Sequence, residues 1–213
     1  MEFEKSLFEA ITTGNKDQAQ RITEEAIADG VDPEKLVNNC MIPAMDDVGN
    51  RFEQGELFLP ELLIAARAMK TSMALLRPLL AKSGARPAGR VVIGTVMGDQ
   101  HDIGKNLVAS LLEGGGFEVI DLGFDVSPQK FVDAVRENSP EVVGMSALLT
   151  TTMPAMKSVI QELAQAGIRD SARVMIGGAP VTQRYADEIG ADGYADNANS
   201  AVTLARSFIS RTP

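Results

Sequence analysis

The sequence contains a single histidine, His101, in the stretch GTVMGDQHDIGKN that runs from Gly94 to Asn106. Two carboxylates, Asp99 and Asp102, flank it, and an apolar run precedes it. An imidazole beside a carboxylate can act as a base, or as a metal ligand whose second nitrogen is held by that carboxylate. These residue types at this spacing therefore point to a binding or catalytic site.

Several common kinds of site are excluded. With one histidine and one cysteine, Cys40, the chain cannot build a zinc site of the Cys/His type. The nucleotide motifs G-x-G-x-x-G and G-x-x-x-x-G-K-[ST] are both absent. A metal bound by His101 must then bring most of its own ligands. A corrin ring does so, because it fills four positions around cobalt and leaves two axial ones.

Composition limits which binding partners and which cellular compartment we expect for this protein. The formal net charge of -9 and the pI of about 4.7 argue against nucleic acid or an anionic membrane surface as a partner. One cysteine excludes a disulfide within the chain, as expected in a reducing cytosol. No signal-like or membrane-spanning apolar stretch occurs, so we expect a soluble protein of the cytoplasm.

The first 80 or so residues predict a small helical bundle. Apolar residues recur at helical spacing in two segments that end at glycines. A third helix is expected from Asp32, its N-cap, to about Gln54, with a kink at Pro43, and a fourth follows. We expect a four-helix bundle over residues 1–84 and a linker over 85–90.

Residues 91–213 have a different rhythm, in which short β-branched runs bounded by glycine alternate with helical segments. The runs are RVVIGTV, FEVIDLG, EVVGMSA, ARVMIGG and ADGYA, and helices are expected near 104–114, 128–138, 154–166, 181–189 and 197–211. This alternation predicts a parallel sheet covered on both faces. The expected fold class is α/β, with an N-terminal four-helix bundle followed by a flavodoxin-like (Rossmann-type) five-stranded parallel sheet.

Three unusual segments each follow a strand of this sheet. GDQHDIG follows the first strand, SALLTTTM the third and GGAP the fourth. Ligands of open parallel sheets bind beyond the carboxyl ends of the strands, at the switch point. We therefore expect the three segments to converge at one edge, which is stronger evidence for a site than any one of them.

Together the segments resemble the cobalamin-binding signature D-x-H-x-x-G…S-x-L…G-G. The gaps match as well, with 41 residues between the first and second parts and 28 between the second and third. The chain is similar over nearly its whole length to the corrinoid proteins of methyltransferase systems and to the cobalamin module of methionine synthase. The matching residues are Asp99, His101, Gly104, Ser146, Leu148, Gly177 and Gly178.

The resemblance implies that His101 displaces the dimethylbenzimidazole of a cobalamin or related corrinoid and binds cobalt from below. Asp99 matches the carboxylate that holds the other imidazole nitrogen. Thr152 stands where methionine synthase has a serine whose hydroxyl contacts that carboxylate. Because the hydroxyl is kept, we expect a Thr152–Asp99–His101 relay, in which Asp99→Asn weakens histidine ligation and shifts the Co(II)/Co(I) potential.

The displaced nucleotide tail is expected to enter the protein. By the resemblance, the hydroxyls of Ser146 and Thr150 contact the tail, Leu148 lines its channel, and the signature glycines let the backbone approach it. Asp102 is also placed to cap the following helix. Further contacts with the cofactor are expected from Gln100, Asp102, Ile103, Tyr194 and Ala195.

The helical part resembles the cap over the methyl face in methionine synthase, with Phe52 and Leu59 at the two shielding positions, although such residues also serve as bundle core. A cap implies a stored methyl group. The resemblance then implies a carrier that takes a methyl onto Co(I) from a substrate:corrinoid methyltransferase acting on a methylamine, methanol, a methoxylated aromatic or a betaine. A corrinoid:acceptor methyltransferase, using tetrahydrofolate or coenzyme M, would receive it from methyl-Co(III). A reductive activase is a further expected partner, and the chain is not expected to turn over alone.

Three other functions stay open. The small subunit of an adenosylcobalamin mutase shares the signature but usually lacks the helical bundle. A non-catalytic cobalamin sensor carries a DNA-binding or signalling domain, for which the predicted elements leave no room. A flavodoxin-like domain without cobalamin would leave the matched spacing as a coincidence.

Overall fold

The computed structural model describes residues 2–83 and 87–210. It divides into two compact units. The first holds the described residues up to Pro87 together with Glu113–Gly116, and the second holds Ala88–Leu112 and the described residues from Phe117 onward. Arg90, expected in the linker, is the first residue of a strand. Residues 85 and 86 of that linker, and residue 211 of the last expected helix, lie outside the described residues.

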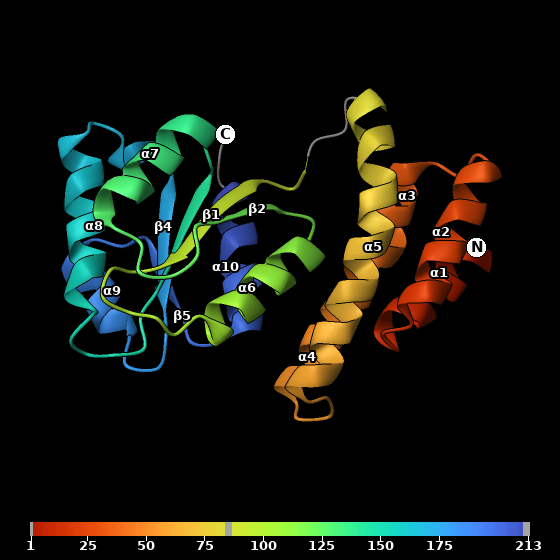
Figure 1. The fold of residues 1–213 in the computed structure, drawn as a ribbon, viewed down its shortest axis with the longest axis horizontal. Coiled ribbons are helices and arrows are strands. Elements are labelled where there is room, and N and C mark those ends of the chain that lie inside the picture. The colour runs from red at the N-terminus through yellow and green to blue at the C-terminus, as the bar shows by residue number, and fades with distance from the viewer. Residues whose placement is uncertain (1, 84–86, 211–213) are drawn as a thin grey trace. The chain divides into compact units, whose positions relative to one another are not determined.

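The first unit is helical (Figure 1). Its capping residues are those that the sequence favours, because Asn15 accepts from the backbone N–H of Gln18 and Asp32 accepts from that of Glu34. The long helix α5 packs against α2 and α4, and α1 packs against the same two helices. The helices are α1 (Glu2–Thr12), α2 (Lys16–Ala28), α3 (Pro33–Leu36), α4 (Ile42–Glu53) and α5 (Leu59–Ser83).

The irregularity expected at Pro43 lies just before it. Residues Val37–Met41 form a π-helical turn, η1, between α3 and α4, and the turn is closed by a hydrogen bond from the Ile42 N–H to the Val37 carbonyl. Proline has no N–H to donate, so the regular hydrogen-bond ladder cannot continue through position 43. The wider turn absorbs this defect, and the predicted third helix becomes one continuous helical stretch of three segments.

The second unit confirms the predicted α/β fold. Its five strands are all parallel, in the order β2-β1-β3-β4-β5 (Figure 1). The strands are β1 (Arg90–Thr95), β2 (Glu118–Asp121), β3 (Val142–Ser146), β4 (Arg173–Gly177) and β5 (Gly193–Ala195). The helices are α6 (Ile103–Gly114), α7 (Pro128–Asn138), α8 (Pro154–Gln165), α9 (Gln183–Ile189) and α10 (Ala198–Ile209), with a short 3-10 turn η2 (Arg169–Ser171).

Helices cover both faces of the sheet, as the buried strands require. On one face, α7, α8 and α9 pack over a core that includes Val143, Met145 and Ile176. Helices α6 and α10 lie on the other face (Figure 1). Among the described helices, none is both long and apolar enough to cross a membrane.

Candidate functional site

Asp99, on the loop after β1, is the most heavily hydrogen-bonded carboxylate of the site, and its residue is fully buried. Its Oδ1 accepts from the His101 backbone N–H at 3.0 Å and faces the His101 Nδ1 at 2.8 Å. Its Oδ2 accepts from the Leu148 N–H at 2.7 Å and lies 2.8 Å from the Thr152 Oγ1. Asp99 thus joins the loop after β1 to the loop after β3.

These contacts decide the charge of Asp99. Burial opposes ionisation and by itself raises the pKa of the carboxyl group. The N–H groups of His101 and Leu148, the Thr152 hydroxyl and the His101 ring outweigh burial and hold the pKa of Asp99 well below its usual range. Asp99 is therefore a carboxylate near neutral pH, in spite of being buried.

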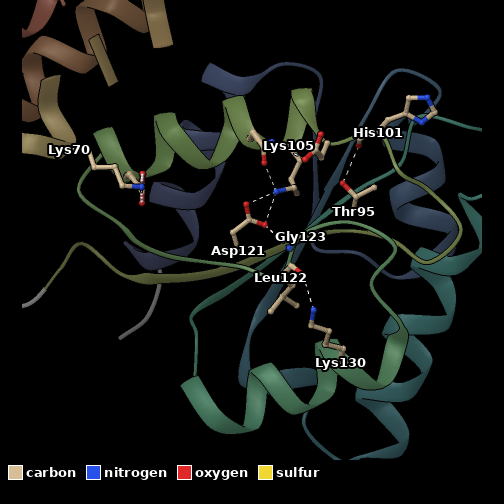
Figure 2. Close-up of polar contacts among 11 residues, drawn as sticks. Lys70, Thr95, His101, Lys105, Asp121, Leu122, Gly123 and Lys130 are labelled. Atoms are coloured by element: carbon tan, nitrogen blue, oxygen red, sulfur yellow. Dashed lines mark hydrogen bonds and ion pairs between the residues drawn. The ribbon is translucent and has the colours of Figure 1, made fainter. Parts of the chain in front are cut away.

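His101 is held at one nitrogen and open at the other. Because Asp99 is an acceptor, the Nδ1 of a neutral imidazole carries the proton and Nε2 keeps its lone pair. The His101 side chain is 52% exposed. Its backbone carbonyl accepts from the hydroxyl of the buried Thr95, which lies beneath it (Figure 2). The arrangement presents one neutral nitrogen ligand at the carboxyl edge of the sheet.

Three of the predicted residues share one row across the sheet. The strand register aligns Thr95 with Ser146, Ser146 with Gly177 and Gly177 with Ala195. Residues in register point to the same face, and the alternation of side chains puts this row on the face opposite Met145 and Ile176. The row is therefore on the α6–α10 face, and its small residues end four strands, β1, β3, β4 and β5, at the edge where His101 lies.

The three glycines of the signature differ in why a residue without a side chain stands there. A Cβ on Gly178, whose φ is +122°, would collide with the Ala147 carbonyl, and one on Gly177 would lie 2.9 Å from the Ala195 carbonyl oxygen. Both positions therefore need glycine for close approach of the protein backbone itself. Gly104, near the start of α6, has nothing within 4 Å of such a Cβ. Only at Gly104 does the space remain open for a ligand.

Of the other residues expected to contact the cofactor, most lie at the carboxyl edge of the sheet, and one side chain points to the opposite face. Gln100, Ile103, Leu148 and Thr150 are exposed on the same loops or beside them. The Asp102 carbonyl accepts from the Asn106 N–H, as at a helix start, while its carboxylate accepts from the Asn106 side chain. The side chain of Tyr194 packs against the core of the α7–α9 face, so of the pair Tyr194 and Ala195 only Ala195 belongs to the row.

Large apolar side chains are exposed on the loops at this end of the sheet, a feature that the sequence predicted only in part. Large exposed apolar residues follow each of the first three strands in chain order, or begin the next helix. They are Met97, Ile103, Phe124, Leu148 and Leu149. Ile103 and Leu148 were expected from the sequence, whereas Met97, Phe124 and Leu149 were not, because isolated exposed apolar residues are common in any sequence.

Lys105 is a second feature that the sequence did not reveal. Lysine is almost never fully buried unless it is paired, and here it is 2% exposed. Its Nζ lies 2.6 Å and 2.5 Å from the two carboxylate oxygens of Asp121 and donates to the Asn106 side chain (Figure 2). The pair ties α6 to the end of β2, one residue beyond Gly104.

In the first unit, the two expected shielding residues are both partly buried. Phe52 lies near the end of α4 and Leu59 begins α5. Phe58, directly before Leu59, is 71% exposed and was not singled out in the sequence. Leu63 and Ile64, in the first turns of α5, are exposed as well.

The donor set suits a corrin ring and its cobalt. Within the described residues, no three His, Cys, Asp or Glu side chains come together to hold a metal ion. His101 alone supplies one nitrogen, which is the number of protein ligands that a corrin leaves to be filled on one side. Exposed apolar groups around it suit a large, mostly apolar ring, and the open space at Gly104 and the small-residue row suit an appended tail.

Comparison with known proteins agrees with this geometry. A B12 binding domain model matches residues 89–203, and a second B12 binding domain model matches residues 4–77. The chain is 45% identical to Trimethylamine corrinoid protein 1 of Methanosarcina acetivorans over 203 residues, 94% of each chain. It is 42% identical to the dimethylamine corrinoid protein of Methanosarcina barkeri over 207 residues, 96% of each chain.

Similarity extends to solved structures. The methanol:cobalamin methyltransferase complex MtaBC from Methanosarcina barkeri contains a chain that matches 99% of the present one, with 81% of its own length covered. The TM-score is 0.89 and the sequence identity is 32%. The match includes both units, so the order of a helical region and a five-stranded parallel sheet is shared.

Proposed function

The chain belongs to the B12-binding corrinoid proteins of methyltransferase systems, and from that premise we propose that it carries methyl groups derived from a methylamine. The observation that carries the proposal is the Asp99-held imidazole of His101, which offers a free Nε2 at the edge of a B12-binding domain. The donor class follows the relatives named for trimethylamine and dimethylamine.

The chain's own residues give the site its chemistry. When bound, the corrinoid supplies a cobalt ion that accepts a methyl group in the Co(I) state and releases it from Co(III). His101 would bind that cobalt through its Nε2, in place of the cofactor's own base. Asp99 holds the Nδ1 proton and so fixes the tautomer, and Thr152 holds Asp99.

The contact between His101 and Asp99 does not depend on cobalt. His101 would bind cobalt through Nε2 alone, so a cobalt state that takes no lower ligand would leave the contact between Nδ1 and Asp99 in place.

We also assign the two ends of the cofactor. The nucleotide tail enters beside Gly104, along the row that includes Ser146 and Gly177, with Thr150 and Leu148 at its entrance. We propose the cap role for residues 1–84, with Phe52, Phe58 and Leu59 as the shielding side chains. The support is the open space at Gly104 and the exposed ring of Phe58.

The partners are a substrate:corrinoid methyltransferase, a corrinoid:acceptor methyltransferase using tetrahydrofolate or coenzyme M, and a reductive activase. The structural similarity to a chain of a methyltransferase complex supports the first of these. All of them act in the cytoplasm in this proposal.

The donor class can be tested by reconstitution. The protein is loaded with cobalamin, reduced to Co(I), and mixed with trimethylamine and the methyltransferase that serves the trimethylamine relative. Loss of Co(I) absorbance that requires both substrate and enzyme supports the proposal, with methanol and its own methyltransferase as the matched control. If methyl iodide methylates the Co(I) protein but neither enzyme does, the protein is still a methyl carrier, and the proposed methylamine donor class is contradicted.

A further inference from the structure

The loop after β2, residues 122–127, is bonded directly to the segment that carries Asp99. The Asp125 carboxylate accepts from the Gly98 N–H through Oδ1 at 2.7 Å, and the Asp125 N–H donates to the Asp99 carbonyl at 3.0 Å. The Asp99 N–H donates to Val96. Asp125 therefore supplies two of the three bonds that fix the main chain on either side of the Gly98–Asp99 peptide.

Making both bonds requires an unusual backbone conformation. Asp125 has φ +52°, and among the described residues it shares a positive φ only with Ser139 and several glycines. Aspartate tolerates this left-handed region better than most residues. In it, the backbone N–H and the carboxylate of Asp125 turn toward the same neighbouring segment, so the strained conformation serves the contact with Gly98 and Asp99.

Further hydrogen bonds anchor the rest of this loop. The carboxylate of Asp121 pairs with the buried Lys105 and also accepts from the Gly123 N–H at 2.9 Å. From the other side, the Lys130 Nζ donates to the Leu122 carbonyl at 2.9 Å (Figure 2). The Gly123 carbonyl accepts from the Thr95 N–H. These contacts fix the loop relative to β2 and α6, and so they fix where Asp125 lies.

We propose that Asp125 is a positioning residue for the His101 site. Through the Gly98 N–H and the Asp99 carbonyl it sets where the Asp99 carboxylate stands, and so holds His101 in the Nδ1–H tautomer with Nε2 directed outward. Asp125 acts only through Gly98 and Asp99, since no hydrogen bond joins its carboxylate to His101. Its effect on cobalt ligation rests on the proposed function, whereas its effect on the tautomer does not.

Three substitutions of Asp125 distinguish the contribution of its carboxylate from the contribution of its backbone conformation. Asp125→Asn keeps an oxygen acceptor and tolerates positive φ, Asp125→Gly keeps only the backbone freedom, and Asp125→Ala loses both. Ser139, at the carboxyl end of α7 with φ +44°, provides the control for left-handed strain through Ser139→Ala. It lies at the other end of α7 from the loop.

The first readout is the tautomer of His101 in the protein without corrinoid. Nitrogen-15 shifts at a pH where the imidazole is neutral report it, and a single histidine needs no assignment. We expect the Nδ1–H tautomer in the wild type, Asp125→Asn and Ser139→Ala, and a mixture in Asp125→Gly and Asp125→Ala. A wild-type tautomer in Asp125→Gly would overturn the proposal, because backbone freedom alone would then suffice.

The second readout is corrinoid binding by the same proteins. We expect the dissociation constant to rise about tenfold in Asp125→Gly and to stay near the wild-type value in Asp125→Asn, as for other groups that orient a metal ligand. Equal affinity in all variants would contradict the role in ligation. If every protein, including the wild type, keeps the benzimidazole on cobalt, the proposed function fails while the tautomer result still decides the role of Asp125.

Discussion

Burying a carboxylate costs free energy that hydrogen bonds must offset, and Asp99 shows how closely the two are matched here. Both of its oxygens are occupied, by donors that come from two different loops. Removing the charge leaves those donors facing an amide or an apolar group. The same contacts that direct His101 also hold the loop after β1 against the loop after β3, so the orientation of His101 and the stability of the fold are linked at this residue.

Asp99→Asn should therefore lower the free energy of unfolding at pH 7, by on the order of 3 kcal/mol, because the amide presents a donor to other donors. The pKa of Asp99 is depressed in the folded state, so its stabilisation is present above the unfolded value of about 4 and is lost as the pH falls through the lower folded value. Urea unfolding from pH 7 down to pH 3 should show the two proteins converging below about pH 4. A constant difference across that range would contradict an ionised Asp99.

Two glycines of the signature make opposite predictions. Gly104→Ala adds a methyl group to open space within a helix, so stability should stay equal or rise by up to about 1 kcal/mol while corrinoid affinity falls. Gly178→Ala forces a left-handed φ and a clash with Ala147, and should destabilise the protein with or without corrinoid. Thermal unfolding and a binding titration separate the two effects, and unchanged affinity in Gly104→Ala would argue against a tail at α6.

At the scale of elements, the strands and helices of the second unit were predictable. Short β-branched runs and glycine-bounded helices fix them, and β2 to β5 lie within the runs read from the sequence. The third helix could be predicted in extent but not in its π-helical turn, since the defect at Pro43 can be absorbed in several ways. The burial of Lys105 was not predictable either, because an isolated lysine in a helix is normally solvated.

The site was predictable where the signature reaches and not beyond it. Asp99, His101 and Thr152 meet as the resemblance implies. The side chain of Tyr194 does not share the face of Ala195, which depends on strand alternation and not on proximity in the sequence. Asp125 depends on long-range contacts between two loops, for which no local pattern exists.

The Lys105–Asp121 pair predicts an asymmetry. Asp121→Ala leaves a buried ammonium group short of acceptors and should cost about 3–5 kcal/mol. Lys105→Met leaves a carboxylate that is 39% exposed and can be hydrated, so about 1–3 kcal/mol is expected. The double variant should resemble Lys105→Met in urea unfolding. If Asp121→Ala were the less destabilising change, Asp121 would not be the group that offsets the cost of burying the Lys105 ammonium group.

At the scale of the whole molecule, we propose a different role for each of the two units. The second unit carries His101, the proposed ligand to cobalt, and the row of small residues. The first unit presents exposed apolar residues around the start of α5, including Phe58 and Leu63. Reactivity of a methyl group on cobalt depends on excluding water, which is the task proposed for this surface.

Phe58→Ala should leave folding unchanged, because its ring is largely exposed, and should shorten the lifetime of the methylated protein under light. If Phe58 shields the methyl group as proposed, loss of its ring would let a photolysed methyl radical escape before it recombines with cobalt. The rate of spectral bleaching measures this, with Phe8→Ala in α1 as the control for loss of an aromatic ring elsewhere in the unit. Equal bleaching rates in wild type and Phe58→Ala would exclude Phe58 from the cap.

The central claim is that the imidazole of His101 replaces the cofactor's own base on cobalt. The most direct measurement is the EPR spectrum of the Co(II) protein loaded with cobalamin, prepared with natural and with nitrogen-15 histidine. Because the chain has one histidine, the label reports on His101 alone. The account predicts that the axial superhyperfine triplet becomes a doublet on labelling. An unchanged triplet would show that the benzimidazole still holds cobalt and would contradict the account.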